Sequence, residues 1–140
     1  MAGAALALVA WLVMMRPEPG AAEHRVYFRY VVLGYVTDDA GRPLRARTVR
    51  VLRDKTGIGY DAETDGDGLF VAVMRLGDES AGETLTVLAG KARAAIVARF
   101  DPSDRRADRG TRVDLEGTRF VERPAAFQAT LARVLGSAVR

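Results

Sequence analysis

Apolar and polar residues alternate along much of the chain between residues 25 and 122. From Arg25 to Asp38, the positions of one parity are apolar or glycine, whereas Arg29 and Thr37 fall on the other parity. A period of two is typical of a β-strand that buries one face. At about 3.3 Å per residue, one unbroken strand of this length is too long for a small sandwich, so we expect a break or bulge near Gly34.

Turn residues separate the other apolar segments. Asp and Gly, which provide side-chain hydrogen bonds to the backbone and positive φ angles, recur at intervals of about eight to twelve residues. This spacing predicts an all-β sandwich of about seven strands. Leu69–Met74 is apolar on both parities, which favours a central strand. The other predicted strands are Thr48–Leu52, Tyr60–Thr64, Thr84–Ala89, Ala92–Phe100, Arg112–Leu115 and Thr118–Glu122.

The hydrophobic period changes near the C-terminus. Apolar residues between Phe127 and Ala138 recur at helical spacing, and Pro124 stands where the first turn begins. We therefore expect an amphipathic helix within residues 124–140. Packing against the sandwich is the simpler interpretation of its apolar face, and docking of a partner is the alternative.

An uninterrupted apolar run, Ala2–Met15, lies at the start of the sequence. Its 14 residues are fewer than the roughly 20 that cross a bilayer as a helix, and they match a signal-peptide core. The small residues Gly20–Ala22 allow cleavage after Ala22. No Lys or Arg precedes the run, so an uncleaved membrane anchor with Arg16 at its edge is the first alternative, and a buried helix of a soluble protein is the second.

The predicted organisation has three parts and an exported location. Residues 1–22 form a signal peptide or membrane anchor, residues 23–123 the β-sandwich, and residues 124–140 the C-terminal helix. The expected location is periplasmic, extracellular or membrane-anchored, with the membrane reached through residues 2–15.

Composition narrows the possible functions. With 49% hydrophobic and 28% charged residues the chain can build a core, and without cysteine it has neither disulfides nor thiolate chemistry. The net charge is only +3, and the basic residues are interleaved with Asp and Glu. This pattern is typical of a solvated, salt-bridged surface, and it argues against a nucleic-acid partner.

One acidic stretch is a candidate metal site. Glu63, Asp65 and Asp67 occupy alternate positions before a glycine, like the first ligands of a calcium loop. An EF-hand loop starting there needs a bidentate Glu at the position that Met74 occupies. Tight-turn formation explains the stretch, and a weak calcium site completed by Asp61 is the alternative.

No catalytic motif accompanies these residues. His24 is the single histidine, and the sequence has no G-x-S-x-G, G-x-G-x-x-G or P-loop pattern. We therefore expect a protein that is not an enzyme and that has no cofactor other than possible calcium. An aromatic platform for sugar stacking competes with ordinary core packing as the role of four tyrosines, Tyr27, Tyr30, Tyr35 and Tyr60.

Two motifs resemble a known family. Residues 34–44, G-Y-V-T-D-D-A-G-R-P-L, resemble the G-x-V-x-D-x-x-G-x-P-L opening of carboxypeptidase regulatory-like domains, which are transthyretin-like (prealbumin-like) and immunoglobulin-like β-sandwiches. Residues 64–70, T-D-G-D-G-L-F, are similar to that family's T-D-x-x-G-x-F turn. The resemblance covers about residues 33–115. It departs from the family at Ala46-Arg47, where a Gly-Ala pair is usual.

The resemblance implies an accessory module of exported and cell-envelope proteins. Such modules serve as spacers, docking platforms or units that bind carbohydrate or protein. We therefore expect a non-catalytic, exported or membrane-anchored β-sandwich with a structural or protein-interaction role at the cell envelope and a protein or polysaccharide partner. Strand addition at an open sheet edge is the expected mode of docking. A calcium-dependent adhesion or carbohydrate-binding module is the alternative.

Overall fold

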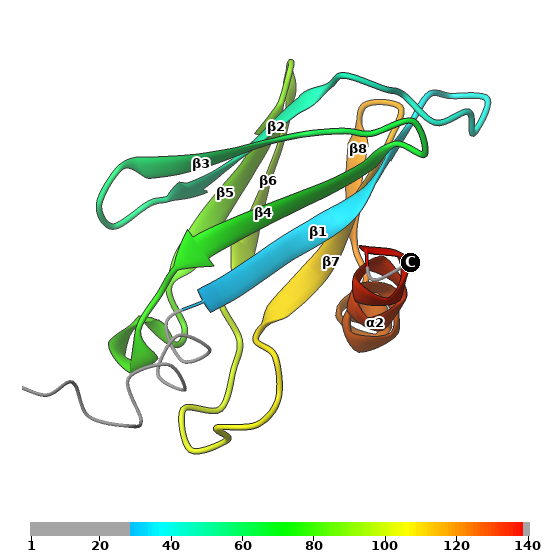
Figure 1. Cartoon of the computed structure of the whole chain (residues 1–140). Coiled ribbons are helices and arrows are strands. Elements are labelled where there is room, and N and C mark those ends of the chain that lie inside the picture. Colours follow the sequence, from blue (N-terminus) through cyan, green and yellow to red (C-terminus); the bar gives the residue numbers. More distant parts are fainter. Residues whose placement is uncertain (1–28, 139–140) are drawn as a thin grey trace, which may run out of the picture.

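The computed structural model describes residues 29–138, which form two four-stranded sheets and one C-terminal helix (Figure 1). The strand orders are β4-β1-β7-β8 and β3-β2-β5-β6. The all-β sandwich is confirmed, with eight strands against about seven expected. Residues 1–22, the expected cleavage site, His24 and Tyr27 lie outside the described residues.

The strands are β1 (Arg29–Thr37), β2 (Thr48–Arg53), β3 (Ile58–Glu63), β4 (Leu69–Arg75), β5 (Thr84–Ala89), β6 (Ala92–Val97), β7 (Gly110–Glu116) and β8 (Arg119–Glu122).

The core lies between the two sheets and follows the alternation in the sequence. On β1 the residues of one parity, Tyr30, Val32 and Val36, are buried in it. On β4 the inward residues are Phe70, Ala72 and Met74. The opposite sheet contributes Val49, Val51, Leu85, Val87 and Ile96.

Strand β1 holds its sheet together by pairing on both sides. It is antiparallel to β4 and parallel to β7, but the parallel ladder stops at Gly34 and Tyr35. There the backbone N–H of Tyr35 donates to Asp114 Oδ1 at 2.9 Å instead. The break or bulge expected in the strand near Gly34 is wrong: β1 runs unbroken from Arg29 to Thr37 and stays paired with β4 through Gly34, and only the parallel ladder to β7 is interrupted there. Gly34 is needed because its backbone lies directly against the Val113 carbonyl.

The prediction that Leu69–Met74 is a central strand is wrong. β4 is an edge strand of its sheet. Its outward residues Val71 and Val73 are 36% and 49% exposed. The segment is apolar on both parities because it carries an apolar patch on its outer face, and not because both of its faces are buried.

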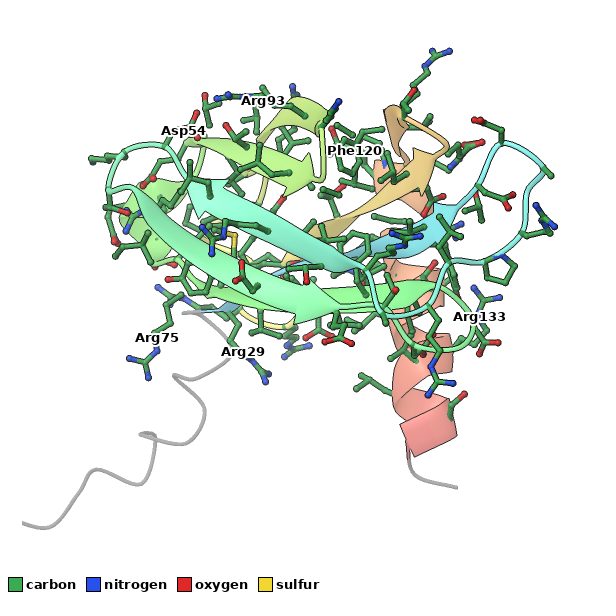
Figure 2. All side chains as sticks on the ribbon, turned by 90° about the horizontal axis from the view of Figure 1, so that it is seen from above. Arg29, Asp54, Arg75, Arg93, Phe120 and Arg133 are labelled. Carbon is green, nitrogen blue, oxygen red and sulfur yellow. The ribbon has the colours of Figure 1, made fainter. Side chains whose placement is uncertain are left out.

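The C-terminal helix is confirmed. A 3-10 turn, η3 (Pro124–Ala126), leads into α2 (Phe127–Ala138). Phe127 and Leu131 are buried against Val31 and Leu33, on the outer face of the sheet that contains β1. In Figure 1 the helix is seen nearly end-on beside β7, and in Figure 2 its C-terminal part extends beyond the sheets. Within residues 29–138, no helix has both the length and the apolar character needed to cross a bilayer.

Ala46, in the β1–β2 loop, has a left-handed backbone. Its φ is 59°, a conformation that costs an L-residue about 1–2 kcal/mol relative to ordinary backbone. Thr64 holds the loop in this shape: its carbonyl accepts from the Ala46 amide at 3.0 Å, and its hydroxyl accepts from the Arg47 amide at 2.9 Å.

Ala46→Gly is expected to stabilise the fold. Glycine removes the left-handed strain and costs some additional chain entropy, which leaves a gain of about 0.5–1 kcal/mol. The melting temperature should rise by a few degrees, measured by circular dichroism. The matched control is Ala95→Gly, at an exposed position in β6 with no positive φ, which should destabilise. Equal destabilisation by both variants would show that Ala46 is unstrained.

Candidate functional site

Of the three candidate calcium ligands, Asp65 holds the turn between β3 and β4. Asp65 Oδ1 accepts the backbone N–H groups of Asp67, at 2.9 Å, and of Leu69, at 3.0 Å. Asp65 and Asp67 line a shallow hollow together with Tyr35 and Arg133, and Glu63 is not part of its lining. Across residues 29–138, no group of three or more His, Asp or Glu side chains is arranged to hold a metal ion.

Calcium is therefore expected to leave the stability unchanged. Asp65 already accepts two amide hydrogen bonds, and the Arg133 cation lines the same hollow, which opposes a bound cation. The measurement is the melting temperature with and without millimolar calcium chloride, using magnesium chloride as the control for ionic strength. A rise of several degrees with calcium alone would establish the site.

Tyr30 and Tyr35 lie on opposite faces of β1. Tyr30 is fully buried in the core, where its ring centroid lies 6.0 Å from that of Phe100, and burial raises the pKa of its hydroxyl to about 12. Tyr35 points to the outer face of the sheet, under the guanidinium groups of Arg112 and Arg133. Core packing is therefore confirmed for Tyr30, and Tyr30 and Tyr35 do not share the one face that the alternative, a platform for sugar stacking, requires.

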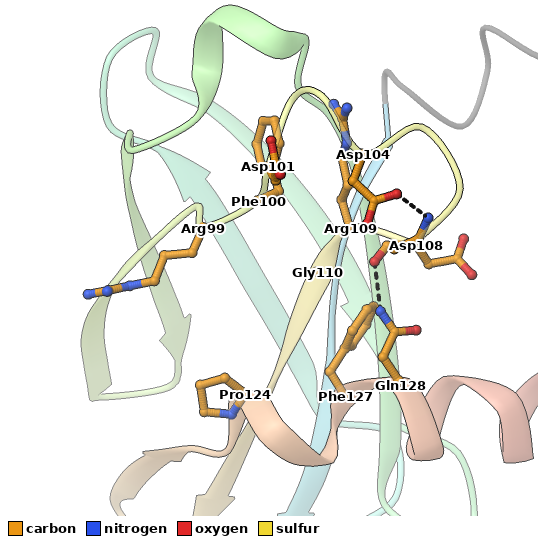
Figure 3. A pocket seen from close by; sticks show the side chains of 11 residues that line it. Arg99, Phe100, Asp101, Asp104, Asp108, Arg109, Gly110, Pro124, Phe127 and Gln128 are labelled. Carbon is orange, nitrogen blue, oxygen red and sulfur yellow. Dashed lines mark hydrogen bonds between the residues drawn. The ribbon is translucent and has the colours of Figure 1, made fainter.

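A cavity of about 270 Å³ lies between the β6–β7 loop and the start of α2 (Figure 3). Its central side chain is Arg109, which is nearly fully buried. Arg109 donates to Asp78 Oδ1 at 2.8 Å, and its guanidinium lies 4.4 Å from the centre of the Phe100 ring. The hydrogen bond from Arg109 is the main cause that lowers the pKa of Asp78. Gln128 joins the helix to the same loop by donating to the Asp108 carbonyl at 2.9 Å.

A second charged network ties α2 to the sheet. Asp114 projects from β7 and is 4% exposed. It accepts hydrogen bonds from Arg112 Nη2, at 2.9 Å, from the Tyr35 amide and from Arg123. Arg112 also donates to Thr130 Oγ1 of the helix at 3.1 Å. Burial alone would raise the pKa of Asp114, but the hydrogen bonds from Arg112 and the Tyr35 amide outweigh it and hold the pKa below its usual value.

A third network joins the end of β2 to the start of β5. Arg53 binds Glu83 in a bidentate pair, at 2.8 and 2.7 Å, and also donates to the buried Ser80 hydroxyl at 3.0 Å. The hydrogen bonds from Arg53 lower the pKa of Glu83 to about 2. Each network contains at least one hydrogen bond between residues 30 or more positions apart, and such a contact leaves no local pattern in the sequence.

Glu83→Gln is expected to change how stability depends on pH. The folded-state pKa of Glu83 lies below its ordinary value of 4.5, so the ion pair stabilises the fold above about pH 4.5 and this contribution is lost as the pH falls towards 2. The variant should be less stable than the native chain by about 1–2 kcal/mol near pH 6. Urea unfolding should show the two chains converging near pH 2.5. The control Glu63→Gln removes an exposed carboxylate with no ion-pair partner in the described residues. A difference independent of pH would contradict the assignment.

An apolar groove of about 160 Å³ lies between the outer face of β4 and α2. Val71 and Val73 form one wall, and Leu131 and Leu135 form the other. β4 is apolar on both parities, a pattern that a central strand shares with an edge strand carrying an exposed apolar face, so the sequence does not distinguish the two.

Comparison with known proteins identifies no family. No protein-family model matches the chain, and no curated protein matches it. Among solved structures, the chain is similar to the dioxygenase domain of a dioxygenase carbohydrate-binding protein fusion from the cellulolytic bacterium Streptomyces sp. SirexAA-E. The identity is 18%, the match covers 68% of this chain and 75% of that one, and the TM-score is 0.38. At this TM-score the similarity carries no argument about the fold or activity of this chain.

Proposed function

We propose that the chain is a non-catalytic β-sandwich module, exported or membrane-anchored, with a structural or protein-interaction role at the cell envelope. Its partner is a protein or a polysaccharide of the envelope. The same proposal includes a transthyretin-like sandwich of the carboxypeptidase regulatory-like type. Both motif turns support that assignment, because Asp38 and Asp65 each accept backbone amides of their own turn, as the motif chemistry requires.

The observation that carries the proposal is the use of the charged side chains. The three most buried ion-pair networks, around Asp78, Glu83 and Asp114, each connect two or more elements of the fold. Among residues 29–138, no buried side-chain nitrogen or oxygen lacks a hydrogen-bond partner. A general acid, base or nucleophile must reach a substrate. The charged side chains of these networks bind one another and hold the sandwich together. This supports a role as a rigid scaffold that acts through its surface.

The N-terminal sequence supports the cellular location. The apolar run Ala2–Met15 and the small residues Gly20–Ala22 are typical of an export signal or an anchor. A module attached there would present the sandwich, which begins at Arg29, on the far side of or next to the membrane.

Fractionation of native cells tests the proposal. The N-terminus of the chain is sequenced in the cytosolic, membrane and exported fractions. A first residue of Glu23 in the exported fraction, or Met1 in the membrane fraction, is the expected result. A chain that retains Met1 and is confined to the cytosol would overturn the proposal. The alternative of a calcium-dependent module, using Glu63, Asp65 and Asp67, is decided by the calcium titration above.

A further inference from the structure

The outer face of β4 and β1 carries a continuous apolar surface. Only four large hydrophobic residues are exposed within residues 29–138, and three of them line the groove beside α2: Val71, Val73 and Leu135, the last 54% exposed. The fourth, Ile58, lies on β3 of the opposite sheet. Clustering of this kind marks an interaction site more often than scattered exposed residues do.

The helix covers the β1 part of this face and leaves the β4 part open. Phe127 and Leu131, in the first half of α2, cover Val31 and Leu33 of β1. The second half of the helix extends beyond the sheets (Figure 2), so Leu135 projects beside the exposed valines of β4. The exposed apolar patch therefore consists of Val71 and Val73 on β4 and of Leu135 on the projecting part of α2.

Two arginines continue the same face. In the β1–β4 ladder, Arg29 is directly opposite Arg75, and the next outward pair is Val31 with Val73. Neither arginine has an ion pair in the described part of the chain, and Figure 2 shows both side chains pointing away from the body on one side. Like charges directly opposite on antiparallel strands repel, and an anion placed between them would relieve that cost.

From the juxtaposition of an exposed apolar patch with an unneutralised Arg29–Arg75 pair, we infer that this face docks on an anionic lipid bilayer. Apolar side chains enter the boundary between headgroups and acyl chains, and arginines beside them bind the anionic headgroups. The one acid that lines the groove is Asp108, so the charge of the face is positive. A symmetric contact with a second copy would bring like-charged arginine pairs close together, which disfavours that occupant.

The inference rests on the proposed location of the chain at a membrane. The segment between the apolar run and β1, residues 16–28, is short, so a run held in the bilayer would keep the face within reach of the surface. Docking of the face would then fix the orientation of the whole sandwich relative to the membrane.

Fluorescent labelling of the full chain tests the inference. The chain has no cysteine, so Val73→Cys and Ile58→Cys each give one site for an environment-sensitive NBD label. The two positions are both exposed and lie on opposite sheets. Vesicles that contain phosphatidylglycerol should shift the emission at position 73 to the blue, and should leave position 58 unchanged. Vesicles of phosphatidylcholine alone should give a smaller shift at 73.

The arginines are tested in the labelled Val73→Cys chain. Arg29→Gln with Arg75→Gln should lower the docking equilibrium constant about 25-fold, or about fivefold for each arginine. Arg93→Gln, on the opposite side in Figure 2, should leave it unchanged. A thermal melt confirms that each variant is folded.

Three results would overturn the inference. The first is a chain that sediments with vesicles while the label at 73 does not respond, which would leave the proposed envelope location intact. The second is an equal response to both lipids and to the arginine variants, which would remove the anionic partner. The third is a blue shift of the label at position 73 without vesicles. If this shift grows with protein concentration, a second copy of the chain covers the face. If the shift does not depend on concentration, another part of the same chain covers it. Failure of the proposed function itself is read separately, from the fractionation of native cells.

Discussion

Gly34→Ala is expected to destabilise the fold by more than about 4 kcal/mol, a large part of the roughly 5–15 kcal/mol by which a typical domain is stable. A Cβ at this position would lie 1.7 Å from the carbonyl oxygen and 2.5 Å from the carbonyl carbon of Val113. Both atoms belong to the backbone of β7, so no side-chain rotation can relieve the clash. Relief would require β1 and β7 to separate, and β1 is the strand that joins β4 to β7.

Urea unfolding followed by circular dichroism measures this effect. The matched control is Gly66→Ala, because a Cβ at Gly66 meets no atom within 4 Å and its φ is not positive. We expect the Gly66 variant to unfold close to the native midpoint, and the Gly34 variant to be largely unfolded without denaturant. A Gly34→Ala chain with a near-native midpoint would show that the two strands do not approach this closely.

Asp114→Ala is expected to cost about 3–5 kcal/mol, because it removes the buried carboxylate that neutralises the partly buried Arg112 guanidinium. Arg112 loses its carboxylate partner in a half-buried position, and the Tyr35 amide loses the acceptor that replaces a ladder hydrogen bond. The loss should also loosen α2, which Arg112 reaches through Thr130. Arg123 is affected less, because it keeps an ion pair with Glu116.

The measurement combines urea unfolding with hydrogen exchange of the α2 amides. Asp61→Ala is the matched control: it removes the partner of Arg50 from a solvent-exposed ion pair, and its effect should be small. Asp114→Asn keeps an acceptor for the Tyr35 amide and should fall between the two. Equal effects of Asp114→Ala and Asp61→Ala would show that the Asp114 network does not hold the fold together.

Local chemistry made most of the elements predictable. In a strand that buries one face, apolar residues repeat every two positions, and Asp or Gly at its ends forms the adjoining turns. These patterns predict each of the eight strands within a few residues of its observed bounds. The helix over Phe127–Ala138 was visible for the same reason, through its different period. The strand break expected at Gly34 does not occur, because this glycine lets the backbone of β1 lie against the Val113 carbonyl without interrupting the strand.

The candidate site was predictable only in part. The turn role of Asp65 is predictable from the sequence, because the two amides that donate to its carboxylate lie within four residues of it. The apolar groove could not, because the outward valines of β4 are exposed or buried according to which strand or helix lies next to them. A pattern that is apolar on both parities is the same for a central strand and for an edge strand with an exposed apolar patch.

By itself, the sequence determined the strands, turns and helix of this protein, because each depends on hydrogen bonds and side-chain alternation among near neighbours. The tertiary structure alone decided the order of the strands, and with it the edge position of β4. It also decided which arginines are neutralised: Arg109 meets Asp78 across 31 positions, whereas Arg29 meets only Arg75 in its ladder. The physical reason is that burial and charge pairing depend on residues that folding brings together. When such residues are far apart in the sequence, no local pattern predicts their contact.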